Sequence, residues 1–242
     1  KKIEKNTTTK VQLISQNINE FVSKAYKITE QLANNKNIET METNKQEPIL
    51  ESTQSRNQYF DLFFIQGMDG MQTGRSSGNL GDRSERWWFK KMMDNPEPFV
   101  SSSYYSITGD IAVTSVFIPI KRDGKMVGIM GSDLKLDYLQ KIVDKYTSKE
   151  EGIYSIIIDG DGNVIAHPDK TKVSELYNYQ TLEKEVKVLD KDGNPKLDKD
   201  GNHITKKEKI EVADGYLKAI EKSKNGDIGA LEVKEDGKKV TV

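Results

Sequence analysis

The sequence predicts an α+β protein in which a long N-terminal helix is followed by two modules with antiparallel sheets. Three observations predict this class. A helical apolar stripe occupies residues 11–32, alternating apolar segments joined by turn dipeptides occupy residues 99–134, and a strand–turn–strand pattern restarts at Gly152. Because helical and antiparallel strand segments come in separate runs, we expect layered α+β modules.

The N-terminal helix is indicated by apolar residues that recur at helical spacing. They are Val11, Ile14, Ile18, Phe21, Val22, Ala25, Ile28 and Leu32, and a stripe of this kind is buried on one side. Hydroxyl side chains at residues 7–9 predict the start of the helix, and a looser polar stretch is expected over residues 34–47. Two interpretations of residues 1–47 stay open: an ordinary packed helix, or a stalk and linker that run along one side and dimerise.

The first module is predicted over residues 48–148 and begins with a β-rich segment at 59–65. A helix is expected at residues 82–93, capped by Asp82 or Ser84 and ended by Asn95-Pro96. Three strands and a closing helix follow. The strands are predicted at 99–105, 110–120 and 126–134, with hairpin turns at Thr108-Gly109 and Asp123-Gly124, and the helix at 138–146.

The second module is predicted over residues 149–242. A buried strand at 154–159, a turn at 161–163 and a returning strand at 164–167 open it. A charged insertion at 183–209 contains two near-copies of Asp-x-Asp-Gly-Asn, at residues 190–194 and 198–202. A helix near residues 213–222 and a hairpin around Asp236-Gly237 complete the module.

The composition excludes several functional classes. Lys and Arg number 37 against 38 Asp and Glu, a net charge of −1, so we expect no nucleic-acid partner. The chain has no cysteine, which rules out disulfides, thiolate zinc sites and cysteine nucleophiles, and fits a cytosolic or an extracytoplasmic protein equally. No apolar run reaches the roughly twenty residues of a membrane span, and residues 1–5 do not resemble a signal peptide.

Neither a metal centre nor a catalytic centre is predicted. The Asp-rich repeats fail as calcium loops because Pro195 and His203 occupy the position that requires glycine, so we expect two solvated turns. His167 and His203 are the two histidines of the chain, and neither has a zinc-binding companion nearby. Because no nucleophile–base pattern or phosphate-binding loop occurs either, we expect no enzyme, no metal and no cofactor.

The residue types at 83–89 point to a ligand-binding pocket. This segment holds two arginines and three aromatic side chains, the Tyr104-Tyr105 pair follows, and Asp133 comes after a glycine-rich strand. A guanidinium offers a planar fork to a carboxylate, aromatic rings supply apolar walls, and an aspartate can take an ammonium group. The pattern therefore favours a small ligand that carries both charges.

Three sequence motifs resemble the double Cache (dCache) family, the extracytoplasmic sensor domains of bacterial chemoreceptors, sensor histidine kinases and cyclic-dinucleotide enzymes. Arg86-x-Trp88-Phe89 is similar to the family's Arg-x-Trp-Tyr. The glycine-rich hairpin series from Thr108-Gly109 to Gly131-x-Asp133 looks like the family's hairpins, and residues 157–168 resemble the opening of its membrane-proximal module. The resemblance implies two PAS-like modules behind the long helix, with the ligand in the distal one.

In the members that bind amino acids, the resemblance implies particular roles. Arg86 and Trp88 would anchor the ligand carboxylate, and Asp133 would take the ammonium. Phe89 replaces a family tyrosine, and the family's Tyr-x-Asp reads here as Tyr104-x-Ser106 or, in another register, as Ser103-x-Tyr105. One of two ammonium-binding acids is therefore absent, so an amino acid is favoured and a carboxylate with a weaker or no amine stays open.

Each candidate also has an ordinary structural interpretation. Arg86 could be a surface arginine paired with Glu85 or Asp82, contributing about 0–1 kcal/mol. Of the neighbours Trp87 and Trp88, one is expected in the core and the other, taken as Trp88, in the pocket. Asp133 could cap a helix or form a turn. The two tyrosines at 104 and 105 could simply pack on the sheet.

The resemblance implies a ligand-binding sensor domain on the outer face of a bacterial cell membrane. The favoured function is a chemoreceptor that binds a small carboxylate, is anchored by segments outside this chain and forms a homodimer through the N-terminal helix. The alternatives are the sensor of a histidine kinase or of a cyclic-dinucleotide enzyme, or a ligand-free surface interaction domain.

Overall fold

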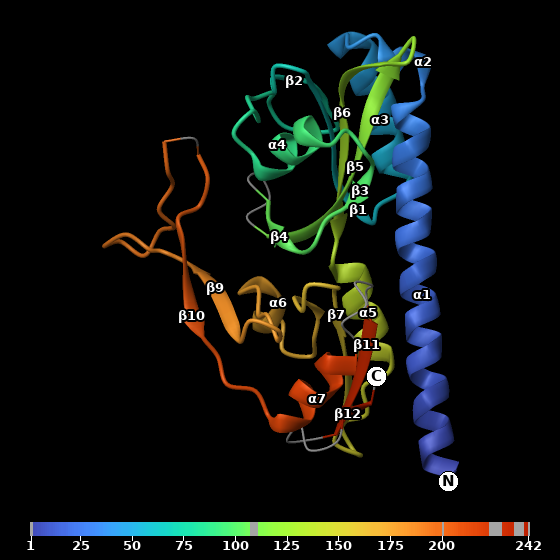
Figure 1. Cartoon of the computed structure of the whole chain (residues 1–242), viewed down its shortest axis with the longest axis vertical. Helices are drawn as coiled ribbons and strands as arrows, with labels where there is room; N and C mark the ends of the chain where they lie inside the picture. The colour runs from blue at the N-terminus through green and yellow to red at the C-terminus, as the bar shows by residue number, and fades with distance from the viewer. Residues whose placement is uncertain (1, 107–110, 200, 223–228, 235–239, 242) are drawn as a thin grey trace. The chain divides into compact units, whose positions relative to one another are not determined.

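A computed structural model describes residues 2–106, 111–199, 201–222, 229–234 and 240–241 (Figure 1). The chain packs as two compact units. Unit 1 comprises residues 1–20, 102–113 and 136–242, and unit 2 comprises residues 21–101 and 114–135. The modules expected at 48–148 and 149–242 stay a prediction, because the units group residues by packing and take α5 (Asp137–Lys145) and residues 102–113 into unit 1.

Helix α1 (Lys2–Ala33) contains the predicted apolar stripe. Six of its expected members are buried, namely Val11, Ile14, Ile18, Phe21, Ala25 and Leu32. The predicted start at residues 7–9 is wrong, because the helix already begins at Lys2. Among the described residues, no helix combines the length and the apolar composition that crossing a bilayer requires.

Residues 34–47 are not the loose stretch that the sequence predicted. They form α2 (Lys36–Glu39) and the beginning of α3 (Thr43–Arg56), which continues through Pro48. The face that α3 buries consists of Gln46, Leu50 and Thr53. Because two of these three residues are polar, the helix has no apolar stripe that periodicity could detect. Gln46 instead donates from Nε2 to the Ile38 carbonyl at 2.7 Å.

A six-stranded sheet has the order β2-β1-β6-β5-β3, and β4 also pairs with β5. Its strands are β1 (Phe60–Gly67), β2 (Gln72–Arg75), β3 (Phe99–Val100), β4 (Tyr104–Tyr105), β5 (Ala112–Arg122) and β6 (Lys125–Lys135). The β5–β6 hairpin turns at Asp123 and Gly124, which both have positive φ, as that dipeptide predicted. The other expected turn, Thr108-Gly109, lies outside the described residues.

The single strand expected at 99–105 is wrong. Two short strands, β3 and β4, occupy this segment, and residues 101–103 between them leave the regular ladder. There the Ser101 hydroxyl accepts from the Ser115 amide at 2.8 Å. A side chain thus replaces a backbone acceptor at this point of the ladder, which alternation of apolar residues cannot reveal.

Within unit 2 the sheet is covered on both faces (Figure 1). On one face, the C-terminal half of α1 packs with α3, and Thr29 of α1 shares a buried 2.7 Å hydrogen bond with Ser132 of β6. The other face is covered by α4 (Trp87–Asp94), whose Trp88 contacts the rings of Phe64 and Phe117. Since side chains alternate along a strand, Asp133 points to the α4 face.

Unit 1 contains a four-stranded sheet with the order β12-β11-β7-β8. Its elements are β7 (Ile153–Ile158), β8 (Val164–Ala166), β11 (Gly229–Lys234), β12 (Val240–Thr241), α5, α6 (Thr171–Ser174) and α7 (Asp214–Lys222). A core of buried side chains joins the sheet to α7 and to the segment around Tyr179. The predicted strand–turn–strand of this module is confirmed, whereas the Asp236-Gly237 hairpin lies outside the described residues.

The charged insertion forms an antiparallel ribbon of β9 (Glu183–Lys187) and β10 (Thr205–Lys209). The turn predicted at Asp190 is confirmed, because its carboxylate accepts from the amides of Asp192 and Asn194, and Gly193 has a φ of 82°. Among the described residues, no group of three or more acidic or histidine side chains is arranged to hold a metal ion.

Candidate ligand-binding site

Helix α4 begins five residues later than predicted, and this places Arg86 at its N-terminus. The Asp82 carboxylate does not cap the helix but accepts from the Ser84 amide at 2.8 Å, which forms a turn before the helix starts. Arg86 is the N-cap residue, with an extended backbone, and its side chain is half-buried. The predicted end is right, because Asn95 terminates the helix.

Trp88 and Phe89 are buried beneath α4, whereas Trp87 is 41% exposed. The Trp88 ring stacks on Phe117 with centroids 4.8 Å apart and lies 5.5 Å from Phe64. Trp88 therefore belongs to the apolar packing between α4 and the sheet. The assignment of Trp88 and Phe89 as ligand contacts stays a prediction.

Asp133 is a buried carboxylate with an incomplete set of partners. Asp133 is 4% exposed, and its Oδ1 accepts a hydrogen bond from the Ser115 hydroxyl at 2.6 Å. Within the described part of the chain, Oδ2 has no hydrogen-bond partner. Two residues earlier, Gly131 leaves room for the Phe64 ring, since a Cβ there would lie 2.4 Å from it. The Phe64 ring therefore lies over Gly131, on the same face of the sheet as Asp133.

The electrostatic surroundings of Asp133 oppose its ionisation. Burial raises the pKa of this carboxyl group to about 7, and the charge of Asp61 pushes the pKa in the same direction. The Ser115 hydrogen bond and the positive charges of Arg86 and Arg75 act against this rise. A buried acid that is only partly compensated is typical of a functional site, because a cationic ligand group would complete it.

Arg75 of β2 was missed by the sequence analysis. It is 4% exposed, and it lies opposite Phe64, on the face of the sheet that α4 covers. Its Nε donates to the Ser77 carbonyl at 2.8 Å and Nη1 to the Gln72 side chain at 3.2 Å. Burial lowers the pKa of this guanidinium. Arg75 thus holds the loop after β2 in place, and a four-residue strand before a glycine-rich loop gives no periodic signal.

Tyr104, Tyr105 and Ser106 belong to unit 1. Tyr104 and Tyr105 form β4, and the buried Ser106 donates its amide to the Ile111 carbonyl at 2.9 Å. The Tyr105 hydroxyl lies 2.8 Å from the Glu185 carbonyl and also bonds the Ser174 carbonyl, and burial raises its pKa. Their assignment to the ligand site stays a prediction.

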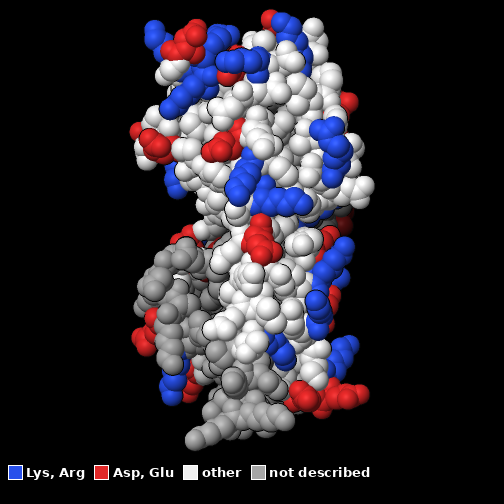
Figure 2. Space-filling model, turned by 90° about the vertical axis from the view of Figure 1, so that its right-hand side faces the viewer, with Lys and Arg blue, Asp and Glu red and all other residues white. Residues whose placement is uncertain are grey.

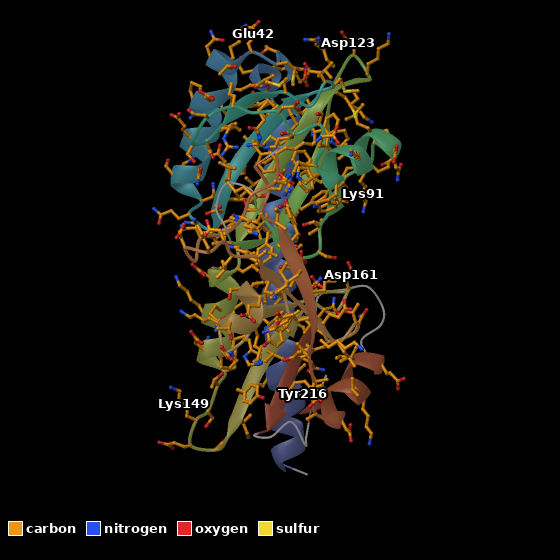
Figure 3. All side chains as sticks on the ribbon, turned by 90° about the vertical axis from the view of Figure 1, so that its left-hand side faces the viewer. Glu42, Lys91, Asp123, Lys149, Asp161 and Tyr216 are labelled. Atoms are coloured by element: carbon orange, nitrogen blue, oxygen red, sulfur yellow. The ribbon has the colours of Figure 1, made fainter. Side chains whose placement is uncertain are left out.

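The segment before β4 packs on the β7–β8 turn of unit 1. The Ser103 amide donates to the Asp159 carboxylate at 2.9 Å, and the Ser102 hydroxyl donates to Asp161, which Figure 3 marks on this turn. Asp159 also accepts from the amides of Asp161 and Asn163 and from the Asn163 side chain. Unlike Asp133, this buried aspartate is fully hydrogen-bonded.

An antiparallel sheet that is covered by helices on both faces is the architecture of a PAS-like module. The chain belongs to the Cache domain family dCache_1, whose match spans residues 1–242. This confirms the resemblance seen in the sequence, and the α+β class with it.

Curated relatives and solved structures agree with this assignment. The chain is 25% identical over 122 residues to the methyl-accepting chemotaxis protein PscA of Pseudomonas syringae, covering 49% of this chain and 19% of the relative. It is 26% identical over 161 residues to PctB of Pseudomonas aeruginosa, covering 64% and 24%. The chain thus spans about a quarter of these relatives or less.

A solved structure shares the fold. The ligand-binding domain of the Pseudomonas fluorescens chemoreceptor CtaA, in complex with L-serine, matches with a TM-score of 0.60 and 20% identity over 77% of this chain and 86% of that one. The domain of PctB with L-Gln matches with a TM-score of 0.54 and 19% identity, covering 76% and 78%.

Proposed function

We propose that this chain is the ligand-binding domain of a bacterial chemoreceptor and binds an α-amino acid in unit 2. In this proposal the ligand carboxylate pairs with Arg86 and the ligand ammonium with Asp133, while Trp88 and Phe89 form the apolar wall. In this role the domain signals ligand binding across the membrane and catalyses no reaction. Family membership and the names of the relatives support the receptor role.

The observation that carries the ligand assignment is the unpaired Oδ2 of the buried Asp133. A carboxylate removed from water needs a cationic or hydrogen-bonding partner, and burial raises its pKa when that partner is incomplete. An ammonium group supplies both a charge and three donors. Solved neighbours with bound L-serine, L-isoleucine and L-glutamine make an amino acid the natural class to test.

Membrane attachment and dimerisation belong to the same proposal. Segments outside this chain would anchor the domain on the outer side of the cell membrane, and α1 would pair with α1 of a second copy. Figure 2 shows a face of the molecule on which described Lys, Arg, Asp and Glu side chains are interspersed with uncharged surface. The solvent side of α1 includes Leu13, which is 46% exposed.

The test is calorimetric titration of the domain with the twenty L-amino acids, followed by the strongest binder on two variants. Arg86→Ala should weaken binding at least 100-fold, because it removes a charge-assisted pair to the carboxylate. Arg83→Ala is the matched control, since it removes a neighbouring half-buried guanidinium and should change Kd by less than about threefold. Equal losses in both variants would contradict the assignment of Arg86.

A further inference from the structure

We infer that Asp61 is the second acid that binds the ligand ammonium together with Asp133. This inference rests on the proposed amino-acid site and assigns a residue to it. The dCache resemblance led us to expect two acids, and the position of the second one is occupied by Ser106 or Tyr105 in this chain. Asp61 comes from a different strand and precedes the glycine-rich hairpin by about fifty residues of sequence.

The geometry of β1 brings Asp61 to Asp133. In the β1–β6 ladder, Phe60 pairs with Leu134 and Leu62 with Asp133, so Asp61 is an extra residue in a β-bulge. A bulge places two residues of one strand opposite one residue of its partner and redirects their side chains. Asp61 and Leu62 therefore both stand opposite Asp133.

The bulge is held in place from α3. The Gln54 side-chain amide donates to the Asp61 carbonyl at 2.8 Å and lies 3.4 Å from the Phe60 carbonyl. These are carbonyls at the point where the ladder is irregular, and a dedicated side chain satisfies them. On the far side of the bulge, the Lys135 amide donates to the Tyr59 carbonyl at 2.8 Å. The irregularity is thus a built feature with partners on both sides.

The charges around Asp133 favour an ammonium at this place. Asp61 is close enough to Asp133 for its negative charge to raise the pKa of Asp133. The positive charges of Arg86 and Arg75 lower the pKa of Asp133. Arg75 is engaged with Ser77 and Gln72, and Arg86 is assigned to the ligand carboxylate. An ammonium between the two acids would bond the unpaired Oδ2 of Asp133 and relieve the repulsion from Asp61.

The inference predicts a ligand with a primary amine on the carbon next to its carboxylate. A 2-hydroxy acid of the same skeleton keeps the carboxylate and the side chain but replaces three charged donors by one neutral hydroxyl. Such a ligand would bring no positive charge to Asp133 and Asp61. The amino acid should accordingly bind far more tightly than its 2-hydroxy analogue.

The test uses the strongest L-amino acid from the titration and its 2-hydroxy analogue as paired probes. Asp61→Asn should weaken the amino acid about 10- to 100-fold, as the loss of a hydrogen bond to a charged group predicts, and should leave the analogue unchanged or bound more tightly. Asp123→Asn, at the exposed β5–β6 turn, is the matched control and should change neither.

Each outcome decides a different claim. If the wild type binds the amino acid, Arg86→Ala abolishes binding and Asp61→Asn has no effect, the assignment of Asp61 is wrong while the proposed site stands. If Arg86→Ala also has no effect, or no amino acid binds, the proposed site fails and the assignment of Asp61 fails with it. Carboxyl NMR on the free domain gives a readout without ligand, because Asp61→Asn should lower the pKa of Asp133, and an unchanged pKa would contradict their proximity.

Discussion

Two buried aspartates, one in each unit, show what separates a structural acid from a binding acid. Asp159 at the β7–β8 turn is 5% exposed and accepts hydrogen bonds from three backbone amides and from Asn163. Asp133 at the end of β6 is buried to the same degree and accepts one, from Ser115. Burial raises the pKa of both.

The difference lies in what the surrounding backbone offers. The turn after β7 bends its amides toward Asp159, so that acid is satisfied by the fold itself. Asp133 lies on strand β6 and not in a turn, and among the described residues only the Ser115 hydroxyl donates to its carboxylate. Asp133 is as buried as Asp159 but accepts fewer hydrogen bonds, so Asp133 is the better candidate for binding a ligand group.

The largest effect is expected from Asp159→Ala, and it should be on stability. The substitution leaves three backbone amides of the turn and of residue 103 without an acceptor, at about 1–3 kcal/mol for each buried group. We expect the free energy of unfolding to fall by about 3–5 kcal/mol. Denaturant titration measures this, and ligand affinity of the folded fraction should stay unchanged. A loss of ligand affinity without a loss of stability would contradict the structural role of Asp159.

Asp133→Asn should give the opposite pattern. The amide oxygen can still accept from Ser115, but the charge for the ammonium is lost, so binding should weaken at least 100-fold. Because the folded-state pKa of Asp133 is raised, the stability that this group contributes is lost as pH rises through about 7. At pH 8 the variant should therefore melt at or above the wild-type temperature, and a clear drop in Tm would identify Asp133 as structural.

The affinity for an amino acid should depend on pH around the pKa of Asp133. The groups that act on it are Asp61, Ser115, Arg86 and Arg75. An ammonium ligand needs the ionised carboxylate, so below about pH 7 binding must release a proton and Kd should rise up to tenfold per pH unit. Titrations at three pH values test this, with the 2-hydroxy analogue as control. Identical slopes for the two ligands would contradict the role of Asp133.

The smallest effect is expected from Tyr105→Phe. It removes the hydroxyl that bonds the Ser174 and Glu185 carbonyls in unit 1, and the free energy of unfolding should fall by about 1 kcal/mol. If Tyr105 acts only in packing this segment, ligand affinity should not change. A tenfold weaker affinity would instead support its place in the ligand site.

The sequence predicted elements whose burial is apolar and periodic. Helix α1 and strands β5 and β6 could be located because their buried residues repeat at helical or strand spacing. Helix α3 could not, because Gln46 and Thr53 occupy its buried face. Helix α4 begins later than predicted because Asp82 forms a turn instead of capping the helix. Aspartate favours both turns and helix N-caps, so residue preferences alone do not decide between the two.

The candidate site was predicted in part for the same reason. Arg86 and Asp133 could be singled out by residue type and motif. Arg75 and Asp61 could not, because Arg75 ends a four-residue strand and Asp61 lies in a bulge, and both features depend on pairing with another strand. The register of a strand is set by both paired strands, so it cannot be predicted from the sequence of one strand alone.

The hydrogen bond between Thr29 and Ser132 fixes the sliding position of α1 on the sheet. One turn away along the same face of the helix lie Ala25 and Ala33, which have no polar group to offer Ser132. A slide of one turn, about 5.4 Å, would take this partner away from the buried Ser132 hydroxyl, whereas the Thr29 hydroxyl would keep its 2.8 Å hydrogen bond to the Ala25 carbonyl. This hydrogen bond therefore opposes a movement of α1 along the sheet by a full helical turn, whereas it is compatible with tilts of the helix and with shifts of a fraction of a turn.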